Sequence, residues 1–312
     1  MFELMSAPVL LFVFNRPEHT RKTIEKLNSL PEVKNTKLFI FSDQAKKEKD
    51  KELVAEVRNI LDQYACNSNF AEVEIRKADT NKGLAASIIG GVTEIINKFG
   101  RVIVLEDDLE VAPDFLAYMN GALDYYKNKE NIWAISGYTF PIKALENYEH
   151  DVYLSGRGCS WGWATWKDRW NTVDWMVSDY PFFKFNLKKR HEFAKWGDDL
   201  PILLDAYIYG EIHSWAIRWC YEAFKQGKFT IYPVKSRVSN HGTDGSGTNF
   251  SHIENRYDTI LNNEVKAIQF DMPEINESIR KEFAKKFATP VMRLKMQIRW
   301  FLIRTGILGT NQ

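Results

Sequence analysis

Cysteine, net charge and long hydrophobic runs are all scarce in this sequence of 312 residues. The three cysteines are an odd number without metal-ligand spacing, which argues against a disulfide framework and favours a reducing compartment. The formal net charge of +1 gives no overall field that would attract nucleic acid. No segment approaches the ~20 apolar residues of a membrane span, and the N-terminus lacks the basic flank and apolar run of a secretory signal. We therefore expect a cytoplasmic protein that does not bind nucleic acid.

Aromatic residues, in contrast, are abundant. They make up 14% of the chain and include 10 tryptophans, most of them between Trp133 and Trp219. Tryptophan buries a large apolar surface and also stacks on flat or sugar-like ligands. The concentration therefore has two interpretations, a stacking site for ligands or a bulky core.

Short apolar runs alternate with helical patterns along the first half of the chain. The patterns predict strands at 8–14, 37–42, 72–77, 101–105 and 131–136, a late strand at 228–233, and helices at 17–30, 46–64, 84–98 and 114–127. This alternation predicts an α/β fold with a mostly parallel central sheet flanked by helices. Right-handed crossovers place the carboxyl ends of parallel strands on one edge. The residues expected to meet there are Asn15, Asp43, Lys82 and the acidic residues after 105.

The most informative segment is 101–115, where an apolar strand ends in acid. Glu106, Asp107 and Asp108 follow the strand directly. Ligands of open α/β sheets bind at the carboxyl ends of the strands. Clustered carboxylates raise one another's pKa unless a cation compensates. Mn²⁺ or Mg²⁺ suits this place, because such ions bridge carboxylates to substrate phosphates. The alternative is an acidic, solvated loop.

Residues 106–115, which read Glu-Asp-Asp-Leu-Glu-Val-Ala-Pro-Asp-Phe, closely resemble the metal-binding segment of the N-acetylglucosaminyltransferase I family. The chain is similar more broadly, over roughly residues 7–250, to GT-A-type nucleotide-sugar glycosyltransferases, including bacterial enzymes that build surface polysaccharides. The resemblance implies a GT-A-type Rossmann-like fold. It also implies a metal-dependent, inverting enzyme that transfers a hexosyl or N-acetylhexosaminyl group from a UDP-sugar to a saccharide or lipid-linked saccharide acceptor.

The resemblance assigns roles to the acidic cluster. It implies that Asp108, the last acid, binds the Mn²⁺ or Mg²⁺ ion directly. Glu106 and Asp107 would then contact the donor sugar or the ribose. A metal ion held by one carboxylate would act as a Lewis acid toward the leaving diphosphate.

The other donor-side positions are shorter matches. Phe14, Asn15 and Arg16 resemble the first nucleotide-binding turn, and Asp43 stands where such families place a uracil-contacting acid. Arg16 or Lys82 could add positive charge near the diphosphate. Each of these two could equally be a surface base.

The catalytic base is where this chain departs from the family. Residues 213–215 resemble the short motif that supplies the base, but His213 stands where family members usually carry Asp. Histidine can act as a general base near neutral pH. Glu211 is the natural alternative, and Asp199 and Asp205 are more remote candidates. His213 could also be a packing residue.

Two further segments match the acceptor side and the metal side of the family. Residues 158–163 resemble its aromatic acceptor segment, so Trp161, Trp163 and Trp215 either stack on sugar or fill the core. Residues 239–248 form a glycine-rich loop whose amides could bind phosphate oxygens. The resemblance implies that His241 in this loop helps to hold the metal or the diphosphate. A plain turn with a structural histidine is the alternative.

The chain divides into three parts by character. Residues 1–127 are predicted to form the nucleotide-sugar-binding half, 128–265 the acceptor-binding and catalytic half, and 266–312 a basic amphipathic C-terminal tail. Basic residues alternate with large apolar ones between 280 and 304, which predicts a helix on the inner face of a membrane. A helix packed on the domain or on a partner subunit is the alternative.

Two other functions stay open. A nucleotidyltransferase also uses a Rossmann-like sheet and acidic metal ligands, but it would carry a glycine-rich, basic signature after the first strand, where 15–17 reads Asn-Arg-Pro. A nucleotide-sugar-binding protein without catalysis is the other possibility. The histidine at position 213 is its only motivation.

Overall fold

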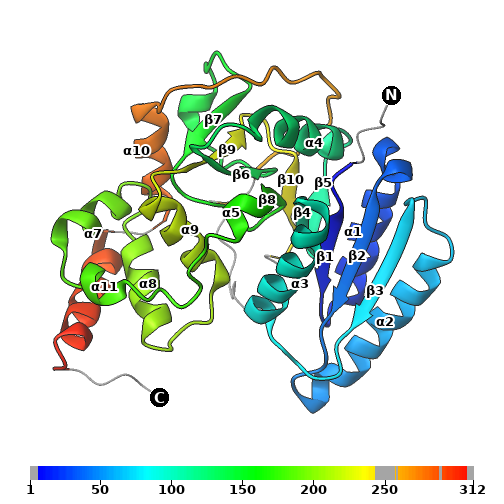
Figure 1. Ribbon diagram of the computed structural model, residues 1–312, viewed down its shortest axis with the longest axis horizontal. Coiled ribbons are helices and arrows are strands. Elements are labelled where there is room, and N and C mark those ends of the chain that lie inside the picture. The colour runs from blue at the N-terminus through cyan, green and yellow to red at the C-terminus, as the bar shows by residue number, and fades with distance from the viewer. Residues whose placement is uncertain (1–5, 243–256, 258, 288–289, 308–312) are drawn as a thin grey trace.

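A mixed β-sheet organises the computed structural model, which describes residues 6–242, 257, 259–287 and 290–307. In this part of the chain the sheet has eight strands in the order β3-β2-β1-β4-β8-β6-β9-β7, and β5 pairs with β10 beside it (Figure 1). The strands are β1 (Val9–Val13), β2 (Lys37–Ser42), β3 (Glu72–Lys77), β4 (Arg101–Glu106), β5 (Leu109–Val111), β6 (Ile132–Ser136), β7 (Val152–Ser155), β8 (Trp163–Trp166), β9 (Phe229–Pro233) and β10 (Val238–Asn240).

Helices cover both faces of the sheet (Figure 1). The α-helices are α1 (Pro17–Asn28), α2 (Lys51–Ala65), α3 (Leu84–Phe99), α4 (Phe115–Tyr126), α5 (Lys167–Trp170), α6 (Tyr180–Phe183), α7 (Leu187–Ala194), α8 (Leu200–Ile208), α9 (Trp215–Lys225), α10 (Glu277–Lys285) and α11 (Pro290–Arg304). Short 3-10 helices lie at Pro31–Asn35, Glu48–Asp50 and Lys143–Leu145. The prediction of an α/β fold with helices around a central sheet is confirmed.

The N-terminal strands form the parallel part of the sheet. β1 pairs in parallel with β2 and β4, and β2 pairs in parallel with β3. Side chains alternate between the two faces of a strand, so Leu11 of β1 packs with α1 and α2, while Leu10 packs with α3. Both are fully buried. Burial on both faces explains why β1 is continuously apolar in the sequence.

The sheet becomes mixed beyond β4. β8 lies between β4 and β6 and is antiparallel to both, and β7 forms an antiparallel edge with β9. β6 and β9 are parallel, so parallel pairs remain the majority. Neither β7 nor β8 was predicted from the sequence. β8 lies in the segment 156–166, which is rich in glycine and tryptophan, and β7 is an edge strand of only four residues.

Tryptophans fill the core on the α3 side of the sheet. Trp163 and Trp215 are 1% and 3% exposed, and their ring centroids lie 5.0 Å apart. Trp133 and Trp219 belong to the same cluster, with ring centroids 4.3 Å apart and planes tilted by 36°. The positions of Trp163 and Trp215 therefore favour the core-filling interpretation over contact with sugar. Trp161 lies on the other face, where it packs on Tyr138 and is only partly buried.

The C-terminal segment packs on the domain. Phe283 of α10 is fully buried against Phe140 in the main core. Ile303 of α11 is 5% exposed and packs with Ile202 and Ala206 of α8. These contacts favour the packed alternative for this side of α11. In the part of the chain that the structure describes, no helix is both long and apolar enough to cross a membrane.

One buried carboxylate joins the helices of this C-terminal region. Asp205 of α8 is fully buried and accepts hydrogen bonds from the Tyr180 hydroxyl at 2.9 Å and from Arg190 at 2.7 and 2.9 Å. Arg304 of α11 also pairs with Asp205. A carboxylate in this position cannot reach a substrate, so Asp205 is not the catalytic base. Asp199 is likewise 8% exposed and pairs with Arg157 through both oxygens at 2.8 Å.

We predict that Asp205→Ala lowers the free energy of unfolding by about 3–5 kcal/mol, because it leaves two guanidinium groups without their partner. Urea denaturation followed by circular dichroism measures this change. Asp62→Ala is the control, because Asp62 is 56% exposed in its ion pair with Lys77 and such pairs contribute only about 0–1 kcal/mol. Equal losses in the two variants would contradict a stabilising role for the buried carboxylate.

Candidate functional site

The acidic cluster lies where β1 and β4 leave the sheet. Glu106 is the last residue of β4 and is in register with Phe12 of β1. Asp107 and Asp108 follow in the turn before β5. The Thr23 hydroxyl of α1 fixes this turn by donating to the backbone oxygens of Asp107 and Leu109 at 2.9 and 3.0 Å. The predicted convergence at this edge is thus observed for the turn after β1 and the acidic residues after β4.

Arg16 is the cation that faces this cluster. It precedes Pro17, which begins α1 with the backbone angle that the first turn requires. Its guanidinium donates to Asp108 Oδ2 at 2.9 Å and also pairs with Asp107. The backbone N–H of Phe14 donates to Asp107 Oδ2 at 3.2 Å. Asp107 is 2% exposed, so these contacts hold it rigidly inside the site.

One guanidinium does not balance three carboxylates. Burial, together with the charges of Asp108 and Asp107, raises the pKa of Glu106 to about 8. Burial also raises the pKa of Asp107, against the opposing effect of Arg16. The oxygen-rich site therefore fits an additional hard cation such as Mn²⁺ or Mg²⁺. Among the described residues, no three Asp, Glu, His or Cys side chains form a metal cage. An ion held by one or two carboxylates and by substrate phosphates needs none.

Asp43 has its carboxylate occupied by the protein. Oδ1 accepts from the N–H groups of Gln44 and Lys82, and Oδ2 accepts from the N–H of Gly83 and the side chain of Asn81. A carboxylate has about four lone-pair sites. These four bonds therefore leave Asp43 little capacity to bind the uracil ring of a donor. Asp43 therefore shapes the turn before α3. The exposed Lys82 lies on this turn, as predicted.

Asn15 also contacts protein. Its side chain donates to Asp50 Oδ1 at 3.0 Å, at the start of α2. Arg58 of α2 closes the neighbouring strand ends, because it donates to the backbone oxygens of Asp43 and Ala78 at 3.4 and 2.7 Å. Arg58 lies inside an ordinary amphipathic helix pattern, so nothing in the sequence pattern indicates these contacts.

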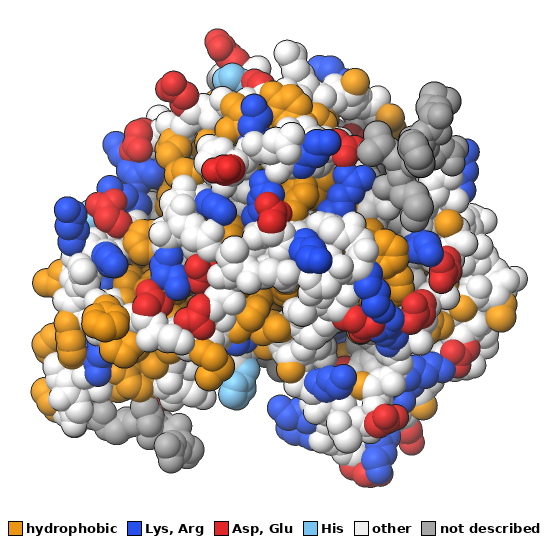
Figure 2. Space-filling view, in the orientation of Figure 1, with side chains coloured by type: hydrophobic (Ala, Val, Ile, Leu, Met, Phe, Trp, Pro, Cys, Tyr) orange, Lys and Arg blue, Asp and Glu red, His pale blue; other side chains and the backbone are white. Residues whose placement is uncertain are grey.

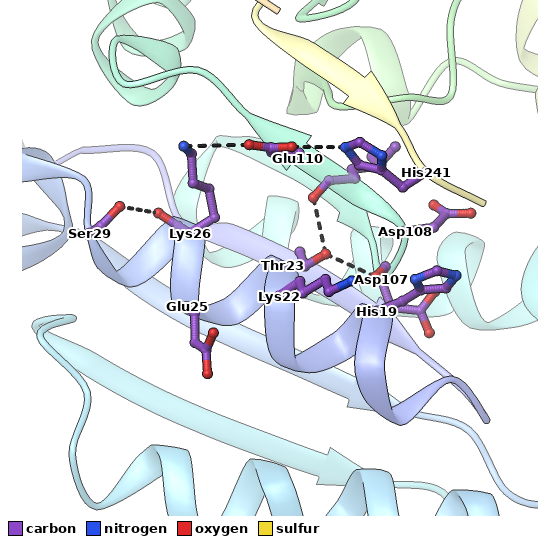
Figure 3. A pocket seen from close by; sticks show the side chains of 11 residues that line it. His19, Lys22, Thr23, Glu25, Lys26, Ser29, Asp107, Asp108, Glu110 and His241 are labelled. Atoms are coloured by element: carbon purple, nitrogen blue, oxygen red, sulfur yellow. Dashed lines mark hydrogen bonds and ion pairs between the residues drawn. The ribbon is translucent and has the colours of Figure 1, made fainter. Parts of the chain in front are cut away.

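The strand pair β5–β10 brings residues 238–242 to the cluster. The His241 N–H donates to the Asp108 backbone oxygen at 2.9 Å. The His241 ring points instead to Glu110, with Nε2 2.8 Å from Oε2 (Figure 3). In this arrangement the His241 ring does not contact the Asp108 carboxylate, and its role as a metal ligand stays a prediction. The rest of the glycine-rich loop, 243–248, lies outside the described residues.

Gly242 lies against the Asp108 carboxylate, which its position in a glycine-rich loop did not indicate. A Cβ atom on Gly242 would lie 2.2 Å from Asp108 Oδ2. Only glycine lets the backbone approach the Asp108 carboxylate this closely without displacing it. A glycine two residues after β10 is thus part of how the chain positions Asp108.

A cavity of about 680 Å³ opens beside Asp108 (Figure 3). Its lining comes from α1 on one side and from the turn after β4, β5 and the loop after β10 on the other. The lining residues are His19, Lys22, Thr23, Glu25, Lys26, Ser29, Asp107, Asp108, Leu109, Glu110 and His241. Asp108 keeps 13% of its side chain exposed, which makes it the more accessible of the two aspartates.

The predicted base residues lie on a different segment. Glu211 and His213 are in the loop between α8 and α9, just before the Ser214 N-cap of α9. Glu211 pairs with Arg299 of α11 at 3.1 Å, whereas the His213 side chain is exposed. Within the described residues, no hydrogen bond or ion pair joins either residue to the acidic cluster. Their catalytic role stays a prediction.

A family model described as the GNT-I family matches residues 3–174, more than half of the chain. An alpha-1,3-mannosyl-glycoprotein 2-beta-N-acetylglucosaminyltransferase of Arabidopsis thaliana is 32% identical over 85 residues, which are 27% of this chain and 19% of that protein. The match thus spans about a fifth of that relative's length. Phe14, Asp43, Lys82 and the acidic cluster all lie inside the family match, whereas Glu211, His213 and His241 lie beyond it.

Two solved structures show a weaker likeness. The mannosyltransferase PcManGT from Pyrobaculum calidifontis, in complex with GDP-Man and Mn²⁺, has a TM-score of 0.37 and 11% identity, covering 53% of this chain and 46% of that one. The WbbM bifunctional glycosyltransferase has a TM-score of 0.29 and 12% identity, covering 45% and 24%. Both TM-scores are below 0.5, too low to assign a function.

The raised pKa of Glu106 leads to a prediction for the metal-free protein. Between its unfolded value of 4.5 and its folded value of about 8, the folded state binds more protons than the unfolded state, so stability falls as pH rises. We expect Glu106→Gln to remove part of this fall and to be more stable than wild type at pH 8, on the order of 1–3 kcal/mol.

Urea denaturation in EDTA across this pH range measures the difference. Glu25→Gln is the control, because Glu25 is exposed on α1 and makes the same charge change. Stability curves for Glu106→Gln and wild type that stay parallel over the whole range would contradict the electrostatic account.

Proposed function

The chain belongs to the GNT-I family, and from this we propose that it is a glycosyltransferase that transfers a sugar from a nucleotide-sugar donor to an acceptor hydroxyl. The observation that carries the proposal is the extent of the family match. It runs through the parallel strands β1 to β4, the turn at Arg16 and the acidic cluster after β4. These elements build the site described above. The transferred group is a hexose or an N-acetylhexosamine.

The donor is a UDP-sugar, and the reaction depends on Mn²⁺ or Mg²⁺ bound through Asp108. Three observations support the metal site: the uncompensated carboxylates, the exposure of Asp108 to the cavity, and the approach of Gly242. The choice of UDP rests on the resemblance alone. When bound, the ion offsets the negative charge that develops on the leaving diphosphate. Asp107 stays buried and orients Arg16, whose guanidinium adds positive charge at the same edge.

The transfer inverts the anomeric centre. The acceptor hydroxyl oxygen forms a bond to the anomeric carbon, the bond from that carbon to the diphosphate oxygen breaks, and the hydroxyl proton passes to a base. UDP leaves with the electron pair of the broken bond. His213 is the proposed base, because its side chain is exposed while Glu211 is paired with Arg299.

Family membership favours this function over a nucleotidyltransferase. A nucleotide-sugar-binding protein without turnover is the second candidate, because a histidine stands at 213 and lies beyond the family match. The cellular role that we propose is bacterial surface polysaccharide synthesis, with a saccharide or lipid-linked saccharide acceptor at the cytoplasmic face of the membrane. Release of UDP in the presence of an acceptor extract, measured against release without it, separates transfer from binding alone.

We predict that Asp108→Asn abolishes metal-dependent donor binding and leaves the fold intact, because the amide keeps the shape of the side chain but not its charge. Calorimetric titration of UDP in the presence of Mn²⁺ measures the affinity. Glu25→Gln, which removes a charge from the same cavity wall, should bind like wild type. If Asp108→Asn keeps the wild-type affinity, the metal assignment is wrong.

We predict that His213→Ala lowers kcat by about 10²-fold or more, the usual scale for losing a general base. Donor affinity should stay within the error of the wild-type value, because the base faces the acceptor. Steady-state kinetics and UDP titration together measure both quantities. Glu211→Gln is the paired variant. Loss of turnover in Glu211→Gln with normal turnover in His213→Ala would transfer the role of base to Glu211.

A further inference from the structure

The segment that contains α6 and the start of α7 exposes large apolar side chains to solvent. Phe182 and Leu187 are each 80% exposed, and Phe185 is 57% exposed. The sequence from 180 to 191 contains five basic or histidine residues and no Asp or Glu; they are Lys184, Lys188, Lys189, Arg190 and His191. Large exposed apolar side chains grouped among basic residues are unusual on a surface that faces only water.

Helix α11 has the same character. Leu294, Ile298 and Phe301 are 59%, 52% and 52% exposed. Their spacing of four and three residues places them on one face of the helix. Ile303 lies on the opposite face, which is buried against α8. The chain carries no Asp or Glu from 283 to its last residue.

The buried carboxylate of Asp205 holds these two segments together. Tyr180 of α6, Arg190 of α7 and Arg304 of α11 all pair with it. The helices around it form one lobe, and Figure 2 shows hydrophobic side chains gathered over its α8 and α11 part. We name the exposed set the α6–α11 surface. Its members are Phe182, Phe185, Leu187, Leu294, Ile298 and Phe301.

We propose that the α6–α11 surface docks the protein on an anionic lipid bilayer. Large apolar side chains interspersed with basic residues are the combination that partitions into the headgroup region and attracts anionic lipids. Residues 180–191 and 283–312 contain no Asp or Glu, so their own charge favours a negatively charged surface over a typical protein partner. Arg190, Arg299 and Arg304 are already paired with Asp205 or Glu211, so the lysines carry this argument. The proposed surface is not limited to the C-terminal tail. Half of its residues, Phe182, Phe185 and Leu187, come from the segment before α8.

This docking does not require the chain to be an active glycosyltransferase, so it is tested without donor or acceptor. We predict that the full-length protein co-sediments with vesicles of phosphatidylcholine mixed with phosphatidylglycerol, and much less with phosphatidylcholine alone. The double variant Phe182→Gln with Leu187→Gln should partition about tenfold less or lower, because both side chains lose their apolar contact with lipid. Both positions are highly exposed, so the fold should not change.

The matched control is Ile260→Gln with Val265→Gln. These side chains are 92% and 76% exposed and lie outside the α6–α11 surface, so this variant should sediment like wild type. Circular dichroism and light scattering accompany each sample. Equal sedimentation of the Phe182/Leu187 variant and wild type would overturn the proposal. A wild-type dimer that the same variant converts to a monomer would also overturn it, and would assign the surface to a second copy of the chain. UDP release measured without vesicles reports separately on the proposed enzymatic function.

Discussion

The pairing of Arg16 with Asp107 and Asp108 is the interaction on which the site depends. Three carboxyl groups meet at the end of β4, and either positive charge or protonation must relieve their mutual repulsion. Arg16 supplies one charge and locks the turn after β1 against the turn after β4. The negative charge that Arg16 does not balance, together with burial, raises the pKa of Glu106. The same imbalance that costs stability without metal is what gives the site its affinity for a divalent ion in our account.

The parallel part of the fold could be predicted from the sequence because it is encoded locally. Residues 72–77 form a strand with the predicted bounds, and the helix beginning at Leu84 follows its turn as expected. Burial on both faces makes β1 and β4 short apolar runs, whereas the edge strand β3 alternates polar and apolar residues. Both patterns are visible without tertiary information. The resemblance in 106–115 is confirmed by the family match for the same reason, since the acidic turn is contiguous in the chain.

The remaining features depend on partners distant in the sequence. β8 is a strand only because it lies between β4 and β6, and nothing in 163–166 distinguishes a core tryptophan from a ligand-binding one. The resemblance predicted that Asp43 contacts the uracil ring of the donor, yet the turn at 81–83 occupies its carboxylate. Asp205 looks like an ordinary helix residue, and only the fold reveals the arginines from α7 and α11 that surround it. The site and the C-terminal lobe are thus each organised around carboxylates that long-range contacts compensate.

The central claim is that the carboxylates at the end of β4 bind a nucleoside diphosphate through a divalent ion. Calorimetric titration of the wild-type protein with UDP, once with Mn²⁺ and once with EDTA, tests it most directly. The account predicts one binding event per chain with the metal present and a large loss of affinity in EDTA. Equal affinity in both titrations would contradict it.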